Sequence, residues 1–169
     1  LAYMVALLRR AIRDDLTGVF ARNSGEEILQ VQWNTSLRNN SALSVAFIDL
    51  DHFKQINDRH GHASGDDALR QTSQQIQSCM RSSDSLVRWG GEEFLLIMPD
   101  TDMTRARQAL ERLQRNGLGV RPEGTPLTAS IGLAERFFDQ VESPGALLEL
   151  ADQRMYQAKE RGRNRIQAW

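Results

Sequence analysis

The chain has 169 residues, of which 40% are hydrophobic and 25% are charged, and this suffices for one globular domain with its own core. Its formal net charge of −1 provides no overall attraction to nucleic acid or to an anionic membrane, so neither is expected as a partner. The single cysteine, Cys79, excludes a disulfide framework and a cluster of thiolate metal ligands, and it fits a reducing, cytoplasmic setting. No apolar run approaches the roughly 20 residues that a membrane span requires, so an anchor is expected only elsewhere in a longer protein.

Residues 1–13 are predicted to form a helix. Its apolar residues recur at spacings of three and four: Leu1, Val5, Leu8 and Ile12. Such a stripe has to be buried on the domain, on a partner helix or on a second copy of the same helix. Because the chain also begins without Met, we expect a fragment of a longer protein, with a linker or stalk helix at 1–13 and one domain at 14–169.

The next elements have recognisable boundary signals. Ser24 and Glu27 have the spacing of a capping box, which predicts a second helix from Ser24 to about Asn39. Residues 43–51 form an apolar run that ends in acids, which is typical of a central strand whose polar end reaches one edge of a sheet. A short helix is predicted over 52–58.

Glycines and capping residues mark the elements that follow. Ser64 is predicted to cap a long helix that ends near Arg81. Gly90 and Gly91 form the signal of a two-residue hairpin turn between two strands. These and the remaining elements are predicted as strands at 84–89 and 93–99, a helix from Thr101 or Asp102 to about Asn116, a strand at 127–135, a helix from Ser143 to Gly162 and an edge strand at 164–169.

The order of the central elements limits the fold. It reads strand, helix, strand, strand, helix, strand, and two right-handed crossovers that share one hairpin place the first and third strands side by side and antiparallel. The predicted fold class is therefore α+β, with a ferredoxin-like βαββαβ core whose central antiparallel sheet is flanked by helices. This topology brings four acids to one edge of the sheet: Asp49, Asp51, Glu92 and Glu93.

The acids at this edge admit two interpretations. Like charges held close together are unfavourable without a cation, and oxygen ligands without cysteine favour Mg²⁺ or Mn²⁺ over zinc. Such ions usually complete their shell with waters and substrate phosphates, and two of them can assist a phosphoryl displacement. A solvated turn with exposed acids is the alternative, and the spacing alone does not decide between the two.

Other polar residues near the predicted edge suit a nucleotide. Lys54 could face a phosphate, and the amide of Asn57 with the carboxylate of Asp66 could pair with a guanine edge. Lys159 and Arg163 are four residues apart at a helix end. Cations are favoured at that end of any helix, so capping is the simpler interpretation of this pair from spacing alone.

Five segments carry motifs in order along the chain: DDLTGVFAR at 14–22, FIDLDHFKQINDRHGHASGDDAL at 47–69, RWGGEEF at 88–94, LTASIGLAE at 127–135 and ADQRMYQAKERGRNRI at 151–166. Together they resemble the GGDEF domain, the catalytic domain of diguanylate cyclases, over essentially the whole chain from Asp14. Its fold is similar to nucleotidyl cyclases and polymerase palms. The departures are Val19 and Ala21 in the first motif, which carry neither metal nor guanine, and Glu92 in place of the signature aspartate.

The resemblance implies an enzyme that condenses two GTP into cyclic di-GMP and releases two pyrophosphates. It implies Mg²⁺ or Mn²⁺ bound by Asp49, the backbone carbonyl of Leu50 and Glu92. Glu92 is usually given the role of accepting the proton from the attacking 3′-hydroxyl, and Glu93 is the second catalytic candidate. The implied substrate-binding residues are Lys54, Asn57, His62, Asp66, Gly90, Gly91, Lys159 and Arg163.

The resemblance also implies an assembly and its regulation. One domain holds one GTP, so a homodimer is needed for catalysis, and residues 1–13 resemble the stalk through which an upstream sensor domain sets the dimer geometry. Arg81 and Asp84 have the spacing and place of the family's inhibitory site for cyclic di-GMP, with Arg112 as a further contact. A helix-terminal arginine followed by an aspartate in a turn is the alternative for that pair.

Two other functions stay open. A catalytically silent GGDEF domain would bind GTP or cyclic di-GMP as a receptor, although such domains usually lose signature residues that this chain keeps. A nucleotidyl transferase acting on nucleic acid would share the carboxylates on a sheet. The near-neutral charge and the lack of a basic groove with interleaved aromatics count against it.

Overall fold

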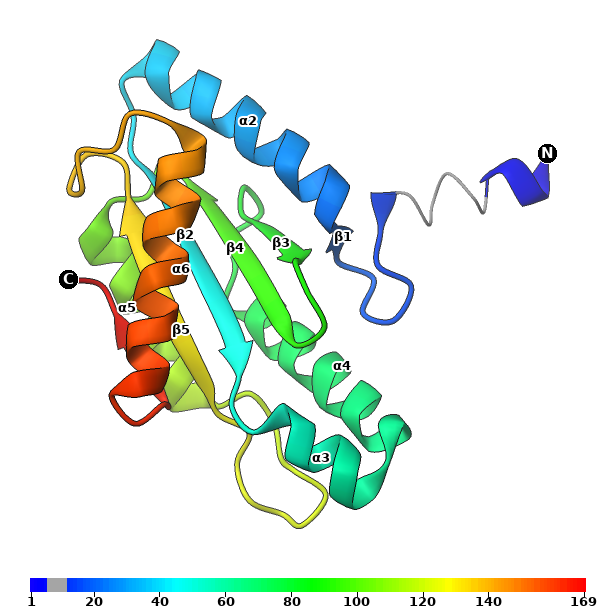
Figure 1. The fold of residues 1–169 in the computed structure, drawn as a ribbon. Helices are drawn as coiled ribbons and strands as arrows, with labels where there is room; N and C mark the ends of the chain where they lie inside the picture. Colours follow the sequence, from blue (N-terminus) through cyan, green and yellow to red (C-terminus); the bar gives the residue numbers. More distant parts are fainter. Residues whose placement is uncertain (6–11) are drawn as a thin grey trace.

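The computed structural model describes residues 1–5 and 12–169 (Figure 1). Residues 2–5 are helical, and the side chains of Leu1, Val5 and Ile12 are exposed. Leu8, the remaining member of the predicted stripe, lies outside the described residues. Within the described ranges, no helix has the length and apolar character that crossing a lipid bilayer requires.

A six-stranded mixed sheet forms the centre of the domain, in the order β1-β3-β4-β2-β5-β6. β2 lies between β4 and β5 and is antiparallel to both, which confirms the predicted pairing of the first and third core strands. β1 was not predicted, and it extends the sheet by pairing parallel to β3, while β6 pairs parallel to β5. The strands are β1 (Phe20–Ala21), β2 (Leu43–Leu50), β3 (Ser85–Arg88), β4 (Glu93–Pro99), β5 (Ala129–Glu135) and β6 (Arg165–Gln167).

Helices cover both faces of this sheet (Figure 1). They are α2 (Arg22–Asn39), α3 (Phe53–His60), α4 (His62–Ser78), α5 (Met103–Asn116) and α6 (Pro144–Glu160). Successive side chains of a strand point to opposite faces. On β2, Ala46 and Ile48 therefore pack in a core with α4 and α5, while Val45 and Phe47 pack in a second core with α2 and α6. The predicted α+β core is confirmed.

Helix α6 lies very close to the sheet. A Cβ atom added at Gly132 of β5 would lie 1.9 Å from the carbonyl oxygen of Ala151 and 2.3 Å from the backbone nitrogen of Met155. Since neither backbone atom can move without the whole helix, only glycine fits there. The close approach brings the last turn of α6, and with it Lys159, to the end of β2.

Two predicted helix caps are wrong. α2 begins at Arg22, with Ala21 as its N-cap residue, so Ser24 lies within the helix. α4 begins at His62 after Gly61, whose φ of 88° is left-handed, and the Ser64 hydroxyl donates to the carbonyl of His60 at 3.2 Å instead of capping. In both cases the N-cap residue lies three residues before the predicted one. α4 also ends at Ser78, three residues before the predicted end.

The caps of the last two long helices are as predicted. Of the two candidates for α5, Asp102 is the N-cap residue, and its side chain accepts a hydrogen bond from the backbone nitrogen of Arg105 at 2.8 Å. The hydroxyl of Ser143 caps α6 by accepting from the backbone nitrogen of Ala146 at 3.0 Å. Both helices therefore start where short polar side chains can satisfy a free backbone N–H.

The predicted two-residue hairpin turn is also wrong. Residues 89–92 all lie in the connection between β3 and β4. Neither Gly90 nor Gly91 has a positive φ, which the two-residue turns require. The N–H groups of Trp89 and Gly90 both donate to the carbonyl of Glu93, at 2.8 and 3.2 Å, and so close a wider loop.

Candidate active site

The end of β2 meets the start of β4, as the topology predicted. Asp49 pairs with Glu93 across the two strands, and the N–H of Leu50 donates to the carbonyl of Glu92 at 3.2 Å. The Asp49 side chain is only 8% exposed, and one of its carboxylate oxygens lies 3.0 Å from Nζ of Lys159. Five residues are thereby brought together from three separate segments: β2, the β3–β4 loop with the start of β4, and α6.

Two acids at this edge have raised pKa values. Burial, followed by the charges of Glu92 and Asp51, raises the pKa of Asp49 to about 6, although Lys159 acts in the opposite direction. Burial, followed by the charge of Asp49, also raises the pKa of Glu93 to about 7. Both carboxyls hold protons more readily than free side chains, chiefly because burial disfavours their charged form.

A pocket of about 310 Å³ opens at this edge, and we call it the edge pocket. Its walls include all of the predicted metal ligands and all of the predicted phosphate contacts: Asp49, Leu50, Glu92, Lys54, Lys159 and Arg163. From their spacing alone, Lys159 and Arg163 could be explained as cations that stabilise the end of a helix. The structure places both in one pocket with the three predicted metal ligands.

The donor set of the edge pocket fits a hard divalent cation. Two carboxylates and one backbone carbonyl are oxygen ligands of the kind that Mg²⁺ and Mn²⁺ prefer. Burial raises the pKa of Asp49, and a bound cation would favour its charged form again. In the described part of the chain, no three acidic, histidine or cysteine side chains form a complete metal cage. Further ligands would therefore come from waters or a bound phosphate.

Asp51, two residues after Asp49, is satisfied by the protein itself. Its carboxylate accepts hydrogen bonds from the hydroxyls of Thr128 and Ser130, each at 2.7 Å, and from the backbone N–H of Asn164 at 2.9 Å. Asp51 is 3% exposed. The sequence places it at the same edge as Asp49, but it gives no sign of these partners, which come from distant segments.

The predicted guanine-binding residues lie on α3 and α4, apart from the residues that line the edge pocket. Asn57 stands on α3 and faces the first turn of α4, where a Cβ at Gly65 would lie 1.9 Å from its Oδ1 atom. That oxygen is buried and accepts no hydrogen bond from any residue within the described ranges. Asp66 follows directly in α4, and His62 is the exposed first residue of that helix.

The signature glycines have space around them. Both are exposed, a Cβ at Gly91 would meet no atom within 4 Å, and one at Gly90 would meet only the Glu93 side chain, at 3.6 Å and beyond. The loop is held from the side by Arg88, which donates to the carbonyl of Gly91 at 2.8 Å and pairs with Asp14 at 3.2 Å. Nothing in the fold itself therefore requires glycine at either position.

A second pocket, of about 210 Å³, contains the three predicted inhibitory residues, and we call it the α5 pocket: Arg81, Asp84 and Arg112 line it. The Arg81 guanidinium donates to the carbonyl of Pro99 at 2.9 Å and to the hydroxyl of Thr101. Asp84 Oδ1 is buried, lies 3.8 Å from the Arg81 guanidinium, and accepts no hydrogen bond from the described residues.

The α5 pocket also contains an arginine that the sequence analysis missed. Arg105 lines the pocket together with Arg112, seven residues further along α5. Residues two helical turns apart lie on the same face of a helix, so this spacing was a signal that could have found Arg105. Three arginines and one aspartate then surround the pocket.

Comparison with known proteins gives a consistent result. The family model described as the diguanylate cyclase GGDEF domain matches residues 11–165. A diguanylate cyclase of Pseudomonas aeruginosa, DgcP, is 36% identical over 162 residues, which is 94% of this chain and 24% of that protein. Diguanylate cyclase A of Treponema denticola is 37% identical over 79% of this chain and 37% of its own length. The chain thus spans less than half of each of these relatives.

Solved structures agree in fold. The GGDEF domain of DgcB from Caulobacter crescentus, solved in complex with c-di-GMP, superposes with a TM-score of 0.84 at 30% identity, covering 94% of this chain and 95% of that one. The diguanylate cyclase SiaD of Pseudomonas aeruginosa, solved with its activator SiaC, superposes with a TM-score of 0.86 at 34% identity, covering 99% of this chain and 65% of that one. By sequence and by fold, the chain belongs to the GGDEF family of diguanylate cyclase domains.

Proposed function

We propose that this domain condenses two GTP molecules into cyclic di-GMP with release of two pyrophosphates. The observation that carries the proposal is the edge pocket, in which three oxygen ligands for a divalent cation stand beside three cationic side chains. Transfer of a nucleotidyl group from GTP needs this combination, because charge develops on the phosphate oxygens while the nucleophile and leaving group are held in place.

The side chains of the edge pocket take separate parts in the proposed reaction. Asp49, the carbonyl of Leu50 and Glu92 would hold Mg²⁺ or Mn²⁺, and a bound pair of such ions neutralises the acids and stabilises the charge on the reacting phosphate. The cations of the pocket, Lys54, Lys159 and Arg163, bind and orient the triphosphate. Glu92, and Glu93 beside the pocket opposite Asp49, are the two candidates for accepting the proton of the 3′-hydroxyl.

The guanine base is assigned to the junction of α3 and α4. The unpaired Oδ1 atom of Asn57 is a buried acceptor that a guanine N–H donor would satisfy, and Asp66 offers a second acceptor nearby. His62 adds a further contact from the start of α4. Gly90 and Gly91 lie in an exposed loop with free space, so the need for glycine there comes from the close approach of the nucleotide.

Catalysis is proposed to require two copies of the domain, 14–169. Each GTP supplies one nucleophile and one leaving group, and the product is two-fold symmetric, so two edge pockets must face each other with a 3′-hydroxyl aimed at the partner's α-phosphate. Residues 1–13 would act as the stalk that sets this geometry for an upstream sensor domain, in a cytoplasmic protein that acts on GTP and not on nucleic acid.

Cyclic di-GMP is proposed to inhibit the enzyme through the α5 pocket. Arg81 and Arg112, joined there by Arg105, suit the phosphates of a dianionic ligand. The buried Oδ1 of Asp84, which accepts no hydrogen bond from the described residues, suits an N–H donor of a guanine base. Binding away from the edge pocket would lower turnover by holding two edge pockets apart.

The proposed reaction is tested by incubating the protein with GTP and Mg²⁺ and identifying the products by mass. Cyclic di-GMP and pyrophosphate, formed at a rate that rises more than linearly with protein concentration, are the expected result. Glu26→Gln, on the exposed face of α2, is the control variant and should leave the rate unchanged. Binding of GTP without turnover would instead identify a receptor, and a requirement for a nucleic-acid template would overturn the proposal.

A further inference from the structure

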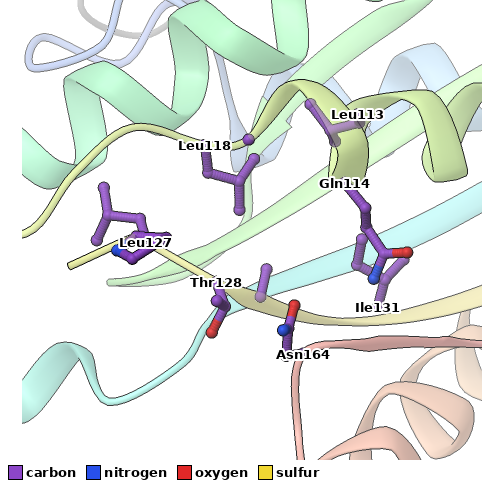
Figure 2. Close-up of a pocket in the computed structure, with 10 residues that line it drawn as sticks. Leu113, Gln114, Leu118, Leu127, Thr128, Ile131 and Asn164 are labelled. Atoms are coloured by element: carbon purple, nitrogen blue, oxygen red, sulfur yellow. The ribbon is translucent and has the colours of Figure 1, made fainter.

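The buried carboxylate of Asp51 joins three segments at the rim of the edge pocket. Oδ2 accepts from the hydroxyl of Thr128 at 2.7 Å and from the backbone N–H of Asn164 at 2.9 Å, while Oδ1 accepts from the hydroxyl of Ser130 at 2.7 Å. The N–H of Asp51 also donates to the carbonyl of Thr128 at 2.9 Å. Figure 2 shows Thr128 and Asn164 next to each other on the wall of a neighbouring apolar cavity.

These bonds distinguish Asp51 from the acids that face a ligand. Three donors from the protein occupy its two oxygens, whereas the neighbouring Asp49 has the ammonium group of Lys159 at 3.0 Å and a pKa raised to about 6. A carboxylate already satisfied in this way gains little from a cation. Asp51 lines the edge pocket, and one of these bonds ties it to the turn that follows α6, while the other two come from the start of β5.

That turn has an unfavourable backbone conformation. Gly162, Arg163 and Asn164 have φ values of 112°, 64° and 47°, so three successive residues are left-handed and two of them are not glycine. Such conformations persist only where the surroundings hold them. The N–H of Arg163 donates to the carbonyl of Ala158 at 2.9 Å, which ties the turn to α6. The bond from Asn164 to Asp51 ties it to the end of β2.

We propose that Asp51 is a positioning residue for GTP binding, which acts by fixing the left-handed turn and thereby the guanidinium of Arg163. This inference rests on the proposed function, because it assumes that Arg163 contacts the triphosphate. Asn164, which bonds to Asp51, is followed directly by β6 and preceded directly by Arg163. Release of the turn therefore displaces Arg163 first. The chain order Asp49, Leu50, Asp51 then gives one strand end both the metal ligands and the anchor of a phosphate-binding arginine.

The test uses binding of 3′-deoxy-GTP with Mg²⁺, since this analogue lacks the nucleophile and its affinity can be measured by calorimetry without turnover. Asp51→Asn keeps the size of the side chain but replaces one acceptor by an NH₂ group, and should weaken binding about tenfold, as expected for a lost hydrogen bond to a charged group. Arg163→Ala should weaken it to a similar extent. The double variant should bind no more than about twofold more weakly than the weaker-binding single variant, because both changes remove the same contact.

Matched variants separate positioning from a general loss of structure. Ser130→Ala removes a donor to Oδ1 but leaves the bond from Asn164 to Oδ2 intact, so it should change the affinity less than about threefold. Thr128→Val removes a donor to Oδ2 and should have an intermediate effect, which keeps the question answerable if Asp51→Asn does not fold. The melting temperature of each variant identifies changes that act through stability.

Three results would overturn the inference. Unchanged affinity in both Asp51→Asn and Thr128→Val would show that the turn does not depend on the carboxylate. A full additional loss in the Arg163→Ala background would show that Asp51 acts independently of Arg163. A change confined to the Mg²⁺ concentration needed for binding would make Asp51 a metal ligand. Absence of 3′-deoxy-GTP binding in the unmodified protein would instead contradict the proposed function.

Discussion

The edge pocket and the α5 pocket both combine acids with basic side chains, but the two pockets differ in net charge. In the edge pocket, burial raises the pKa of Asp49 to about 6, and three acids stand beside three cationic side chains, so a divalent cation would supply the net positive charge that a triphosphate needs. In the α5 pocket, one aspartate stands among three arginines, so an anion can bind there directly. The residual charge of a pocket, and not the number of charged residues, indicates its ligand.

The largest expected effect tests the edge pocket. Asp49→Asn removes a charged cation ligand, and we expect turnover of GTP to fall about 100- to 1,000-fold, the scale seen when one charge-stabilising group is lost from an active site. Initial rates of cyclic di-GMP formation measure this. Asp58→Asn, an exposed residue of α3, is the control and should retain the rate. A rate within tenfold of the unmodified protein in Asp49→Asn would remove Asp49 from the metal site.

The second largest effect is expected on product inhibition, from a change in the α5 pocket that leaves the edge pocket unaltered. Arg81→Ala removes a charged hydrogen-bond donor, so the concentration of cyclic di-GMP that halves the rate should rise about 10- to 100-fold. The initial rate without added product should stay the same. Arg115→Ala, an exposed residue of α5 outside the pocket, is the control. Unchanged inhibition in Arg81→Ala would contradict the assignment of this pocket.

Removal of Mg²⁺ should separate the two pockets in a single protein. With a chelator present, the affinity for 3′-deoxy-GTP should fall at least about tenfold, because the acids at the strand end are then uncompensated. The affinity for cyclic di-GMP should change less than about twofold, since arginines alone bind its phosphates. Calorimetric titration of each ligand with and without Mg²⁺ measures both affinities. An equal loss of affinity for the two ligands would show that the two pockets do not differ in their need for the metal ion.

A smaller effect is expected from Arg105, the arginine that the sequence analysis missed. Arg105 lines the α5 pocket. Within the described residues, its guanidinium makes no hydrogen bond to a backbone carbonyl like that of Arg81 to Pro99. Arg105→Ala should therefore raise the inhibitory concentration of cyclic di-GMP a few-fold, as for an exposed ion pair. Inhibition curves for Arg105→Ala, and for the double variant that also carries Arg81→Ala, measure the contribution of Arg105 to the binding of cyclic di-GMP.

The smallest effect concerns stability and pH. The folded pKa of Glu93, about 7, lies above its ordinary value of 4.5, so between these values the folded state holds a proton that the unfolded chain has released. Stability should therefore fall as the pH rises from about 5 to about 7.5. Solvent screening limits the loss to about 1 kcal/mol, or about 2–4 °C in melting temperature. Mg²⁺ should restore the stability at pH 7.5 and have little effect at pH 5. A melting temperature that does not change with pH in calorimetry would contradict the raised pKa of Glu93.

Much of this architecture could be predicted because the signals were topological. Two right-handed crossovers around one hairpin are enough to put Asp49 and Glu93 at the same edge of the sheet, and in the structure the two residues pair directly. The position of Lys159 depended on more than the helix pattern, because α6 reaches the end of β2 only through its close contact at Gly132. No local propensity reveals such a contact between distant segments.

The failures have a common physical cause. Ser24 and Ser64 carry capping signals, but the backbone enters each helix earlier, through Ala21 and through the left-handed Gly61, because tertiary contacts fix where the chain turns. The partners of Asp51 were out of reach for the same reason, since Thr128 and Asn164 lie 77 and 113 residues away in sequence.

The most direct test of the account is a crystal structure of the protein with 3′-deoxy-GTP and Mg²⁺. The account predicts a metal ion bound by Asp49, the Leu50 carbonyl and Glu92, with the triphosphate against Lys159 and Arg163 and the base at the α3–α4 junction. Nucleotide bound elsewhere, or a triphosphate in the edge pocket without contact to these acids through a metal ion, would contradict it.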